Sequence, residues 1–419
     1  IHNFKGDYLA AGLWMDLVDI SKKYNFNLKI EGIERKFDYT INQEEFTNRV
    51  NEKWAKAEKK PRDYQIESAF KIIKYKCCLA ELATSAGKTL MTYMILSYLL
   101  DKGICKKVLM VVPNVDLVLQ GAEDFYEYNR ASVELDLEIQ QIYAGSKIRN
   151  NANIVIGTYQ SLTKKDAEFF DEYDCVVIDE AHSGSSVSVK TILEKCKCDR
   201  RFGISGTFPK EGTLDRITIM SHTGPIISTI RADFLMKEGY ISTCKVVVLE
   251  LNYADKETKE AFKRIYESNR SQGAKVLKLE QNYCIENKTR LQFIIDSVLR
   301  VKKNSLILFY RIEYGNKLYD ALRLQTDRKI FYIDGGVDKD LRGIQKEELE
   351  EGEGKIMIAS YGTFAQGINV KNIHNIFLTE SFKSDTIIRQ SIGRGLRLHA
   401  QKDNLLILDF VDDFRVSNY

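Results

Sequence analysis

The sequence has few of the residues that mark linkers, low-complexity tails or strongly cationic proteins. Only 4 of its 419 residues are proline and 25 are glycine, which argues against long linkers. Lys and Arg total 62 against 59 for Asp and Glu, so the net charge is only +3. A charge this small does not by itself indicate a nucleic-acid partner, and any such contact must come from local patches.

Cysteine pairs and long apolar runs are also missing. None of the 8 cysteines forms a Cys-x-x-Cys pair, so we expect no zinc site. No secretory signal is visible, and no apolar run is long enough to cross a membrane. We therefore expect reduced thiols, a cytoplasmic location and no membrane partner. Because the first residue is Ile1 and not Met, we expect a fragment or a chain that lacks a disordered start.

Short apolar runs separated by longer helical stretches repeat along the chain. The first series lies at 77–82, 108–113, 154–159, 175–180 and 201–207, and the second at 246–251, 306–311, 330–334, 355–360, 375–380 and 405–410. Such runs are typical of buried parallel strands in α/β layers. Two series predict two tandem α/β lobes, each a parallel sheet flanked by helices, over residues 59–232 and 233–419. The joint is expected near 228–244.

Two segments depart from this pattern. Residues 1–58 are predicted to form a small α+β accessory segment, with a helix over 12–26, a short strand over 27–33 and a charged helix over 44–60. Residues 252–284 are polar and rich in lysine. We favour a solvated helical insertion there, with a DNA-contacting element as the alternative.

The sequence LATSAGKT, at 82–89, directly follows an apolar run and indicates a phosphate site. In a strand–turn–helix, backbone N–H groups cradle phosphate oxygens, here those of Thr84, Ser85, Ala86 and Gly87. Lys88 adds positive charge at the β- and γ-phosphates of ATP, and the Thr89 hydroxyl suits Mg²⁺. Leu82 stands where the general pattern has its first glycine. The alternative is an ordinary turn with a chance Gly-Lys-Thr.

The sequence VVIDEAH, at 176–182, ends a buried run in two carboxylates. Asp179 can hold Mg²⁺, and Glu180 can orient and deprotonate the attacking water. A solvated acidic turn is the alternative. It is less favoured because ligands of open α/β sheets bind at the carboxyl ends of strands, where Lys88 is also expected.

The sequence RQSIGRGLR, at 389–397, carries two arginines three residues apart. A helix would place Arg394 and Arg397 on one face, where they can neutralise charge on a transferring phosphoryl group. Alone, a solvated basic face is the better interpretation. Together with the glycine-rich turn in the first lobe, the pair predicts one ATP site built between the two lobes.

In their order and spacing, these motifs resemble those of superfamily-two helicases over roughly residues 59–413. The stretches that carry the resemblance are PRDYQ (61–65), LATSAGKT (82–89), VVPNVDLVLQ (111–120), YAGS (143–146), GTYQSL (157–162), DEAH (179–182), SGT (205–207), LFYR (308–311), YIDGG (332–336), ASYGTFAQGINV (359–370) and RQSIGRGLR (389–397). The resemblance implies two RecA-like lobes and an ATP- and Mg²⁺-dependent motor.

The resemblance also implies roles for further residues. Gln65 would read the adenine edge and Arg62 would pack on the base, while Gly367 and Asn369 would contribute to nucleotide binding. Gln390 would join the catalytic group. His182, Ser205 and Thr207 would couple γ-phosphate loss to movement. The predicted DNA contacts are Pro113, Asn114, Gly145, Thr158, Tyr159, Gln160, Tyr310, Arg311, Gly335, Gly336, Ser360, Tyr361 and Thr363. For the three tyrosines, packing inside the lobes is an equal alternative.

Within the superfamily, the sequence is similar to the UvsW-type phage recombination helicases. This implies a DNA helicase that remodels branched DNA, works as a monomer and acts in the host cytoplasm. An RNA helicase is one alternative. A restriction-type translocase is another, although no nuclease signature is visible. A non-catalytic DNA-binding scaffold is the alternative from a different class, and the intact charged residues argue against it.

Overall fold

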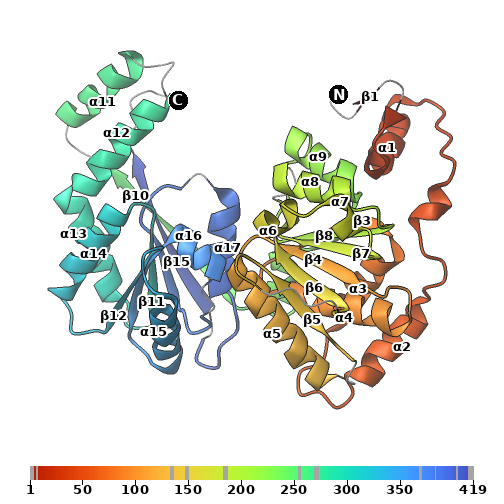
Figure 1. Cartoon of the computed structure of the whole chain (residues 1–419). Coiled ribbons are helices and arrows are strands. Elements are labelled where there is room, and N and C mark those ends of the chain that lie inside the picture. Colours follow the sequence, from red (N-terminus) through yellow and green to blue (C-terminus); the bar gives the residue numbers. More distant parts are fainter. Residues whose placement is uncertain are drawn as a thin grey trace. The chain divides into compact units, whose positions relative to one another are not determined.

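The computed structural model describes residues 4–5, 8–132, 136–146, 151–182, 187–252, 256–268, 273–367, 370–382, 384–402 and 404–413. The chain divides into two compact units, Ile1–Phe234 and Leu235–Tyr419, which we call lobe 1 and lobe 2 (Figure 1). Each lobe has its own sheet and its own hydrophobic core.

Lobe 1 is built on a seven-stranded sheet in which all neighbouring strands are parallel. In spatial order the strands are β5 (Ile139–Ile142), β6 (Ile154–Thr158), β4 (Val108–Val112), β7 (Cys175–Asp179), β8 (Arg200–Ser205), β3 (Cys77–Leu82) and β9 (Ile226–Ile230). All five residues of β4 and of β6 are buried. This burial on both faces explains why these segments are apolar throughout instead of alternating.

Helices cover both faces of the lobe 1 sheet (Figure 1). The helices of lobe 1 are η1 (Ala11–Leu13), α1 (Trp14–Tyr24), η2 (Ile33–Lys36), α2 (Gln43–Lys53), α3 (Asp63–Lys74), α4 (Lys88–Asp101), α5 (Val115–Ala131), α6 (Tyr159–Thr163), α7 (Ala167–Phe170), α8 (Val187–Lys195) and α9 (Leu214–Thr223). Polar side chains cap the N-termini of several of these helices. The Asn42 side chain, for example, accepts hydrogen bonds from the backbone N–H groups of Glu44 and Glu45 in the first turn of α2. A further helix, α10 (Ala232–Lys237), lies at the junction between the units.

Lobe 2 is built on a six-stranded parallel sheet. Its spatial order is β10 (Thr243–Asn252), β15 (Asn404–Asp413), β14 (Asn375–Leu378), β11 (Ser305–Phe309), β13 (Ile356–Ser360) and β12 (Ile330–Ile333). The helices are α11 (Lys256–Ser268), α12 (Gly273–Glu286), α13 (Lys288–Arg300), α14 (Ile312–Arg323), α15 (Lys339–Glu351), α16 (Tyr361–Gly367) and α17 (Asp385–Gly395). Two parallel α/β lobes are therefore confirmed.

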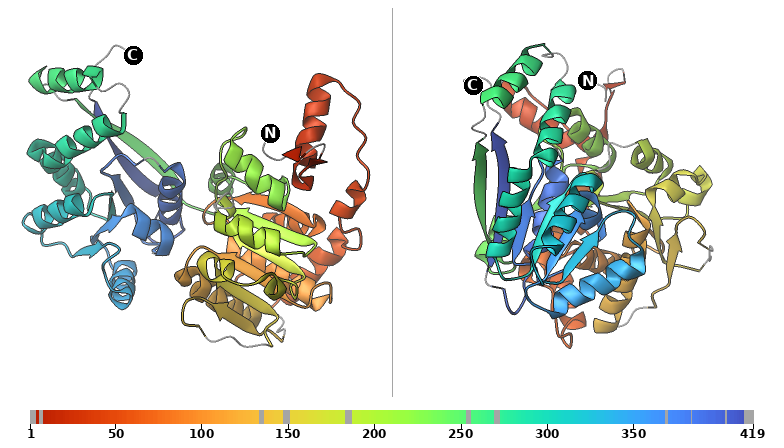
Figure 2. Two further views of the ribbon diagram at one scale, coloured as in Figure 1. Left: turned by 45° about the horizontal axis from the view of Figure 1, so that its top comes forward. Right: turned by 90° about the vertical axis from the view of Figure 1, so that its left-hand side faces the viewer.

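The two departing segments are mostly helical. The Lys-rich stretch forms α11 and α12, which extend beyond the end of β10 (Figure 2). The strand predicted over 27–33 is wrong: residues 26–30 form no regular element, and η2 begins at Ile33. Asn25 and Gly32 adopt left-handed conformations on either side of this stretch, and such conformations do not continue an extended strand.

Two further differences concern strands. The short strands β5 and β9 at the two edges of the lobe 1 sheet were not predicted, since β5 carries two glutamines and β9 a Ser-Thr pair. The run at 246–251 was expected to be buried, but β10 is an edge strand and Val246 and Val248 are exposed.

Among the described residues, no helix combines the length and apolar character needed to span a membrane.

Candidate active site

The turn between β3 and α4 forms a compact loop at the carboxyl edge of the lobe 1 sheet. Its residue Ser85 has φ 71° and Gly87 has φ 84°, so both adopt the left-handed conformation. A Cβ atom on Gly87 would lie 2.3 Å from Nε2 of Gln65, so only glycine fits there. Lys88 and Thr89 begin α4, as a phosphate-binding turn requires.

The side chain of Gln65 is hydrogen-bonded to the backbone of this loop. Its Nε2 donates to the Ala86 carbonyl (2.9 Å), and its Oε1 accepts from the Arg62 backbone N–H (2.9 Å). The Tyr64 hydroxyl donates to the same Ala86 carbonyl (2.9 Å). Gln65 is buried, and both ends of its amide bond to the protein. Each end of the amide makes one of its two possible hydrogen bonds in this way, and the reading of an adenine edge by Gln65 stays a prediction.

The lysine and the two carboxylates meet at the same edge of the sheet. Nζ of Lys88 lies 3.3 Å from Oε1 of Glu180, although 92 residues separate them. Strand β7 ends at Asp179, whose Oδ1 accepts from the Glu180 backbone N–H (2.9 Å). Glu180 has φ 50°, which is unusual for a residue other than glycine and indicates a backbone held by its surroundings. The expected convergence of Lys88 with the acidic pair is present.

The two carboxylates have opposite pKa shifts. Burial, with the Glu180 charge beside it, raises the pKa of Asp179 above its ordinary value. Burial also acts to raise the pKa of Glu180, but the charge of Lys88 and the side-chain hydrogen bonds from His182 and Lys88 outweigh it and hold that pKa below its ordinary value. Glu180 is therefore ionised, whereas Asp179 is a costly anion that a divalent cation would stabilise. With the Thr89 hydroxyl, Asp179 offers the oxygen ligands that Mg²⁺ prefers.

A polar chain leads from Glu180 to the turn after β8. Nδ1 of His182 lies 3.2 Å from Oε2 of Glu180 and 2.9 Å from Oγ of Ser205. The buried Ser205 hydroxyl also donates to the Thr207 carbonyl (2.8 Å). A Cβ atom on Gly206 would lie 3.3 Å from Nζ of Lys88 and 3.7 Å from Oγ1 of Thr84. Glu180, Lys88 of the glycine-rich turn and Ser205 of the Ser-Gly-Thr turn are thus in direct contact, and their coupling role stays a prediction.

The predicted DNA-binding residues of lobe 1 lie in turns at the ends of its strands. The side chain of Asn114, after Pro113, accepts from the Leu117 N–H and caps α5 (3.0 Å). Thr158 caps α6 in the same way and is buried, and Gln160, two residues further on, is exposed. Gly145 has φ 86° and open space where a Cβ atom would be.

Two of the three tyrosines are core residues. Tyr159 is buried and its hydroxyl donates to the Asp179 carbonyl, which fixes the end of β7. Tyr361 is buried and its ring stacks on Phe382 at 5.0 Å. Packing, the alternative interpretation, is therefore the correct one for both side chains. Tyr310 is 52% exposed and remains available for a ligand.

The lobe 2 loops are tied together by Glu380, which follows β14. Its Oε2 accepts from the backbone N–H groups of Tyr310 (2.6 Å) and Arg311 (3.0 Å). The Arg311 guanidinium donates to Gln281 (2.7 Å) and Asn282 (2.5 Å) on α12. Arg311, predicted to contact DNA, therefore fastens the Lys-rich segment to the loop after β11. Sequence reasoning did not identify Glu380 or this link.

The remaining predicted contacts of lobe 2 lie after β12 and β13. Gly335 and Gly336 are exposed, and the Gly336 N–H donates to Oδ1 of Asp334 (2.8 Å). The Ser360 hydroxyl donates to that of Thr363 (2.8 Å) at the start of α16. Gly367 is the last residue of α16, and Asn369 lies outside the described residues.

The arginine pair of lobe 2 lies at the end of α17. The expectation that one helix face carries both residues is wrong, because α17 ends at Gly395 and Arg397 follows the helix. The reason is tertiary: the buried Lys402 ammonium donates to the carbonyls of Gly395 and Arg397 (2.5 and 2.6 Å). The Ser242 N–H donates to the carbonyl of Leu396 (2.8 Å).

These bonds satisfy the last carbonyls of α17 and stop it there. Gln390 lies within α17, partly buried. Lys402, which sequence reasoning missed, is thus a positioning residue for the arginine segment. A lysine soon after a helix that ends in glycine is the only sequence signal for it.

Two families of known proteins match the two lobes. Residues 58–210 match "Type III restriction enzyme, res subunit", and residues 289–399 match "Helicase conserved C-terminal domain". The chain is 29% identical over 357 residues to "ATP-dependent DNA helicase uvsW" of Enterobacteria phage T4, covering 84% of this chain and 68% of that protein. It is 24% identical over 266 residues to "Putative ATP-dependent RNA helicase L396" of Acanthamoeba polyphaga mimivirus, covering 62% of this chain and 47% of that protein.

Solved structures show the same fold. A fragment of a putative HsdR subunit of a type I restriction enzyme from Vibrio vulnificus superposes with a TM-score of 0.62, at 18% identity, over 86% of this chain and 66% of that one. At this identity the likeness concerns the fold alone. The two matched domains, with the motif residues converging at the edge of lobe 1, show that the chain carries the two domains of a superfamily-two helicase, and they support an ATP-hydrolysing enzyme.

Proposed function

We propose that this protein is an ATP-dependent DNA helicase or translocase that remodels branched DNA. The observation that carries the proposal is the continuous contact from Lys88 through Glu180 and His182 to Ser205. A site that binds phosphate, activates water and transmits the loss of the γ-phosphate needs these groups in this order. A scaffold without catalysis would have no use for an ionised glutamate held in a strained conformation beside a lysine.

Each group has a distinct role in the proposed reaction. Lys88 and the backbone of the glycine-rich turn hold the phosphates of ATP. Glu180 orients and deprotonates the attacking water, which its low pKa allows because it stays ionised. Thr89 and Asp179 would hold Mg²⁺, which supplies charge neutralisation at the phosphates. His182 and Ser205 sense the change at Glu180 and pass it to the turn at Thr207.

In the proposed cycle, the arginines of lobe 2 act on the phosphates that lobe 1 holds. Arg394 and Arg397 would stabilise the charge of the transferring phosphoryl group, and their loss of contact after hydrolysis would release the lobes. Differential contact with the γ-phosphate supplies the energy for this shift.

The DNA specificity is supported by the similarity to the T4 protein that is named a DNA helicase. Exposed groups at the strand ends, such as Tyr310, Gly145 and Gly335, suit contacts to sugars and phosphates that do not read sequence. We also propose that the protein works as a monomer in the cytoplasm, of the host if the chain is phage-encoded. The mimivirus relative named an RNA helicase makes RNA the second candidate substrate.

A substrate panel tests the proposal. ATP-dependent unwinding would be measured on a four-way junction, a fork, an R-loop, a tailed DNA duplex and a tailed RNA duplex. We expect the branched DNA substrates to be unwound fastest and to stimulate ATP hydrolysis most. The Glu180→Gln variant is the control, because it keeps the shape of the site and removes the base.

The outcomes separate the alternatives. Preference for the RNA duplex would replace the DNA assignment with the RNA one. Equal rates on branched and tailed DNA would remove the branch specificity and leave a general translocase. ATP turnover of zero with saturating nucleic acid of every kind would overturn the motor assignment.

A further inference from the structure

A second cavity of lobe 1 lies at the opposite edge of the sheet from the ATP site. It has a volume of about 510 Å³ and lies where strands β3 and β8 begin, whereas the phosphate-binding turn follows the end of β3. A six-residue strand is about 20 Å long, so the two sites are separate. We call this cavity the basic pocket, because its lining includes Arg35, Lys36, Lys76, Lys197, Arg201 and His222.

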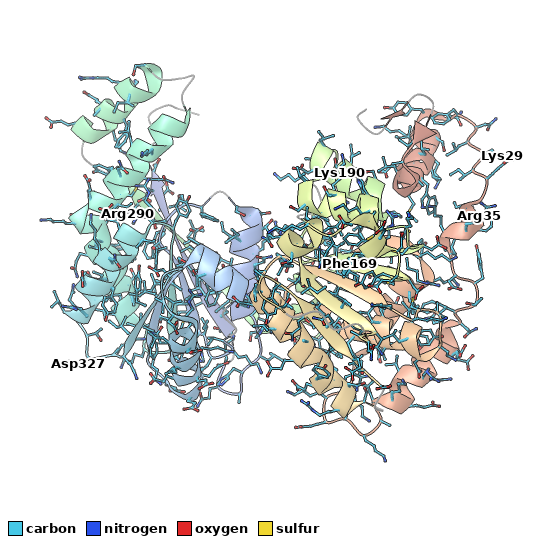
Figure 3. The ribbon with its side chains drawn as sticks, viewed as in Figure 1. Lys29, Arg35, Phe169, Lys190, Arg290 and Asp327 are labelled. Atoms are coloured by element: carbon cyan, nitrogen blue, oxygen red, sulfur yellow. The ribbon has the colours of Figure 1, made fainter. Side chains whose placement is uncertain are left out.

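The main chain brings three of these cations side by side. The Lys76 N–H donates to the Lys36 carbonyl (3.0 Å), and the Arg201 N–H donates to the Lys76 carbonyl (2.8 Å). Phe37 and Tyr75 form a β-bridge between the first two segments. The N-terminal segment, which passes beside the sheet and carries Arg35 (Figure 3), thereby adds its charges to those of the sheet. The charge cluster is a product of the fold, since Lys36 and Arg201 are far apart in the sequence.

The positive charge of the basic pocket is largely uncompensated. Within the described residues, no carboxylate forms an ion pair with Arg35, Lys36, Lys76 or Arg201. Asp199 is the one carboxylate among the lining residues. Other lining cations do have partners: Lys197 lies 2.9 Å from Asp171. Like charges without counterions repel one another, so an anion in the pocket would lower the free energy of the folded state.

Arg201 is fixed in place without losing its charge. Its guanidinium donates to three backbone carbonyls, those of Cys196 (2.7 Å), Cys198 (3.3 Å) and His222 (3.4 Å). Carbonyl oxygens orient a guanidinium but do not neutralise it. Gly224 closes the wall with φ 133°, where a Cβ atom would lie 2.2 Å from the Cys77 carbonyl oxygen. The pocket therefore has a rigid wall and one immobilised cation, which reduces the entropy cost of binding.

We propose that the basic pocket binds phosphate groups, and that the ligand is the backbone of the nucleic acid on which the helicase acts. Its volume falls within the range of about 300–1,000 Å³ that is common for ligand sites. Lysines and arginines around a space of this size suit phosphate oxygens. Trp14 lines the pocket and gives an aromatic surface for a sugar or a base. The choice of nucleic acid rests on the proposed function, whereas the phosphate chemistry does not.

Variants at matched positions test the basic pocket. Lys76 immediately precedes β3 and lines the pocket, and exposed Lys106 lies just before β4 in the same sheet without lining it. Binding of a labelled DNA duplex to the full chain would be measured over a series of salt concentrations. Lys76→Ala should weaken binding several-fold and reduce the slope of log K against log salt by about 1, because one phosphate contact is lost. Lys106→Ala should change neither.

A second measurement distinguishes backbone phosphate from free phosphate compounds. Pyrophosphate would be titrated into a Lys88→Ala protein in which Trp54 is replaced by Phe, so that the fluorescence of Trp14 is the signal. The same protein with Lys76→Ala added is the comparison. A loss of pyrophosphate binding on adding Lys76→Ala, with DNA binding unchanged, would keep the phosphate site and assign it to free compounds. No effect of Lys76→Ala in either measurement would overturn the proposal. Failure of the unaltered protein to bind nucleic acid would instead contradict the proposed function, and the pyrophosphate titration alone would then decide the pocket.

Discussion

The two lobes share one kind of sheet but use their buried charges differently. In lobe 1, Lys88 and Glu180 face each other at the carboxyl edge, 3.3 Å apart and each still partly exposed. In lobe 2, the Arg290 guanidinium is buried and donates to both oxygens of Asp412, to the Tyr314 hydroxyl and to the Thr379 carbonyl. The first arrangement keeps its charged groups at the sheet edge where a ligand can reach them, whereas the second places each nitrogen of the guanidinium against a partner within the protein.

This difference shows that burial of charge is not itself a sign of a catalytic site. Glu380 and Lys402 of lobe 2 are also withdrawn from solvent, and both bind backbone groups at the ends of strands and helices. Their role is to fix loops in place. What distinguishes the lobe 1 site is that its charged groups converge on a phosphate-binding turn and remain accessible.

Breaking the buried pair of lobe 2 should have the largest effect on stability. Arg290→Ala leaves the Asp412 carboxylate buried without its partner, and we expect a loss of about 3–5 kcal/mol in the free energy of unfolding. Chemical denaturation measures it. Lys317→Ala is the control, since Lys317 forms an exposed pair with Glu313 on α14. A loss below about 1 kcal/mol would show that the pair does not hold lobe 2 together.

Removing the lysine of lobe 1 should act on catalysis instead. Lys88→Ala should lower DNA-stimulated ATP hydrolysis by about 10²–10³-fold, because one preorganised cation at the phosphates is lost. Salt-sensitive DNA binding should stay near that of the unaltered protein. Steady-state ATPase assays test this, with exposed Lys190→Ala as the control. Near-normal ATP hydrolysis by the Lys88→Ala variant would contradict the assignment of the turn at Lys88 as the ATP site.

Replacement of Lys402 should have a smaller effect than that of Arg290. Lys402→Met leaves the carbonyls of Gly395 and Arg397 without their donor, which should cost about 1–3 kcal/mol in unfolding free energy. The variant should also lower the ATPase rate, since the arginine segment loses its anchor. Lys371→Met, an exposed neighbour, is the control. Unchanged ATPase and stability would mean that Ser242 alone ends α17.

The same residue predicts a pH dependence. Burial lowers the pKa of Lys402 from 10.5 to about 8, with Glu350 acting in the opposite direction. Between these values the unfolded chain holds more protons than the folded one, so the contribution of Lys402 to stability rises with pH. The difference in unfolding free energy between the unaltered protein and Lys402→Met should therefore grow from pH 8 to pH 10. A constant difference would contradict the lowered pKa.

The smallest expected effect concerns the backbone of the phosphate-binding turn. Ser85 has φ 71°, a conformation that costs most residues roughly 1–2 kcal/mol and glycine almost nothing. Ser85→Gly should therefore preserve ATP hydrolysis within about twofold and change stability by at most about 1 kcal/mol, whereas Ser85→Val should lower both. Activity and denaturation measurements on the pair test this. Equal activity and stability of the two variants would show that the left-handed conformation at position 85 is not needed for the turn.

Much of the fold was predictable because buried parallel strands have a distinctive composition. The run at 77–82 coincides with β3, and those at 108–113 and 175–180 differ from β4 and β7 by one residue. The edge strands β5 and β9 were not predictable in this way. An edge strand is stabilised by pairing on one side and has no need for a continuous apolar sequence.

The candidate site was predictable to the extent that it depends on strand ends. Lys88, Asp179 and Glu180 follow strands of one parallel sheet, so their convergence follows from the topology. The partners of Gln65 and Arg311 were not predictable, because each binds a segment remote in the sequence. The position of Arg397 beyond the helix was missed for the same reason, since Lys402 determines where α17 ends.

The sequence by itself determined the two α/β lobes and the order of the motifs, because apolar runs and turn residues act locally. The predicted ATP site has its lysine and its carboxylates at one edge of the lobe 1 sheet. The tertiary structure alone decided which charges pair and which remain open. It buried Tyr159 and Tyr361 in the core and gathered Lys36, Lys76 and Arg201 around one pocket. Electrostatic energy depends on distance in space, which a linear sequence does not contain.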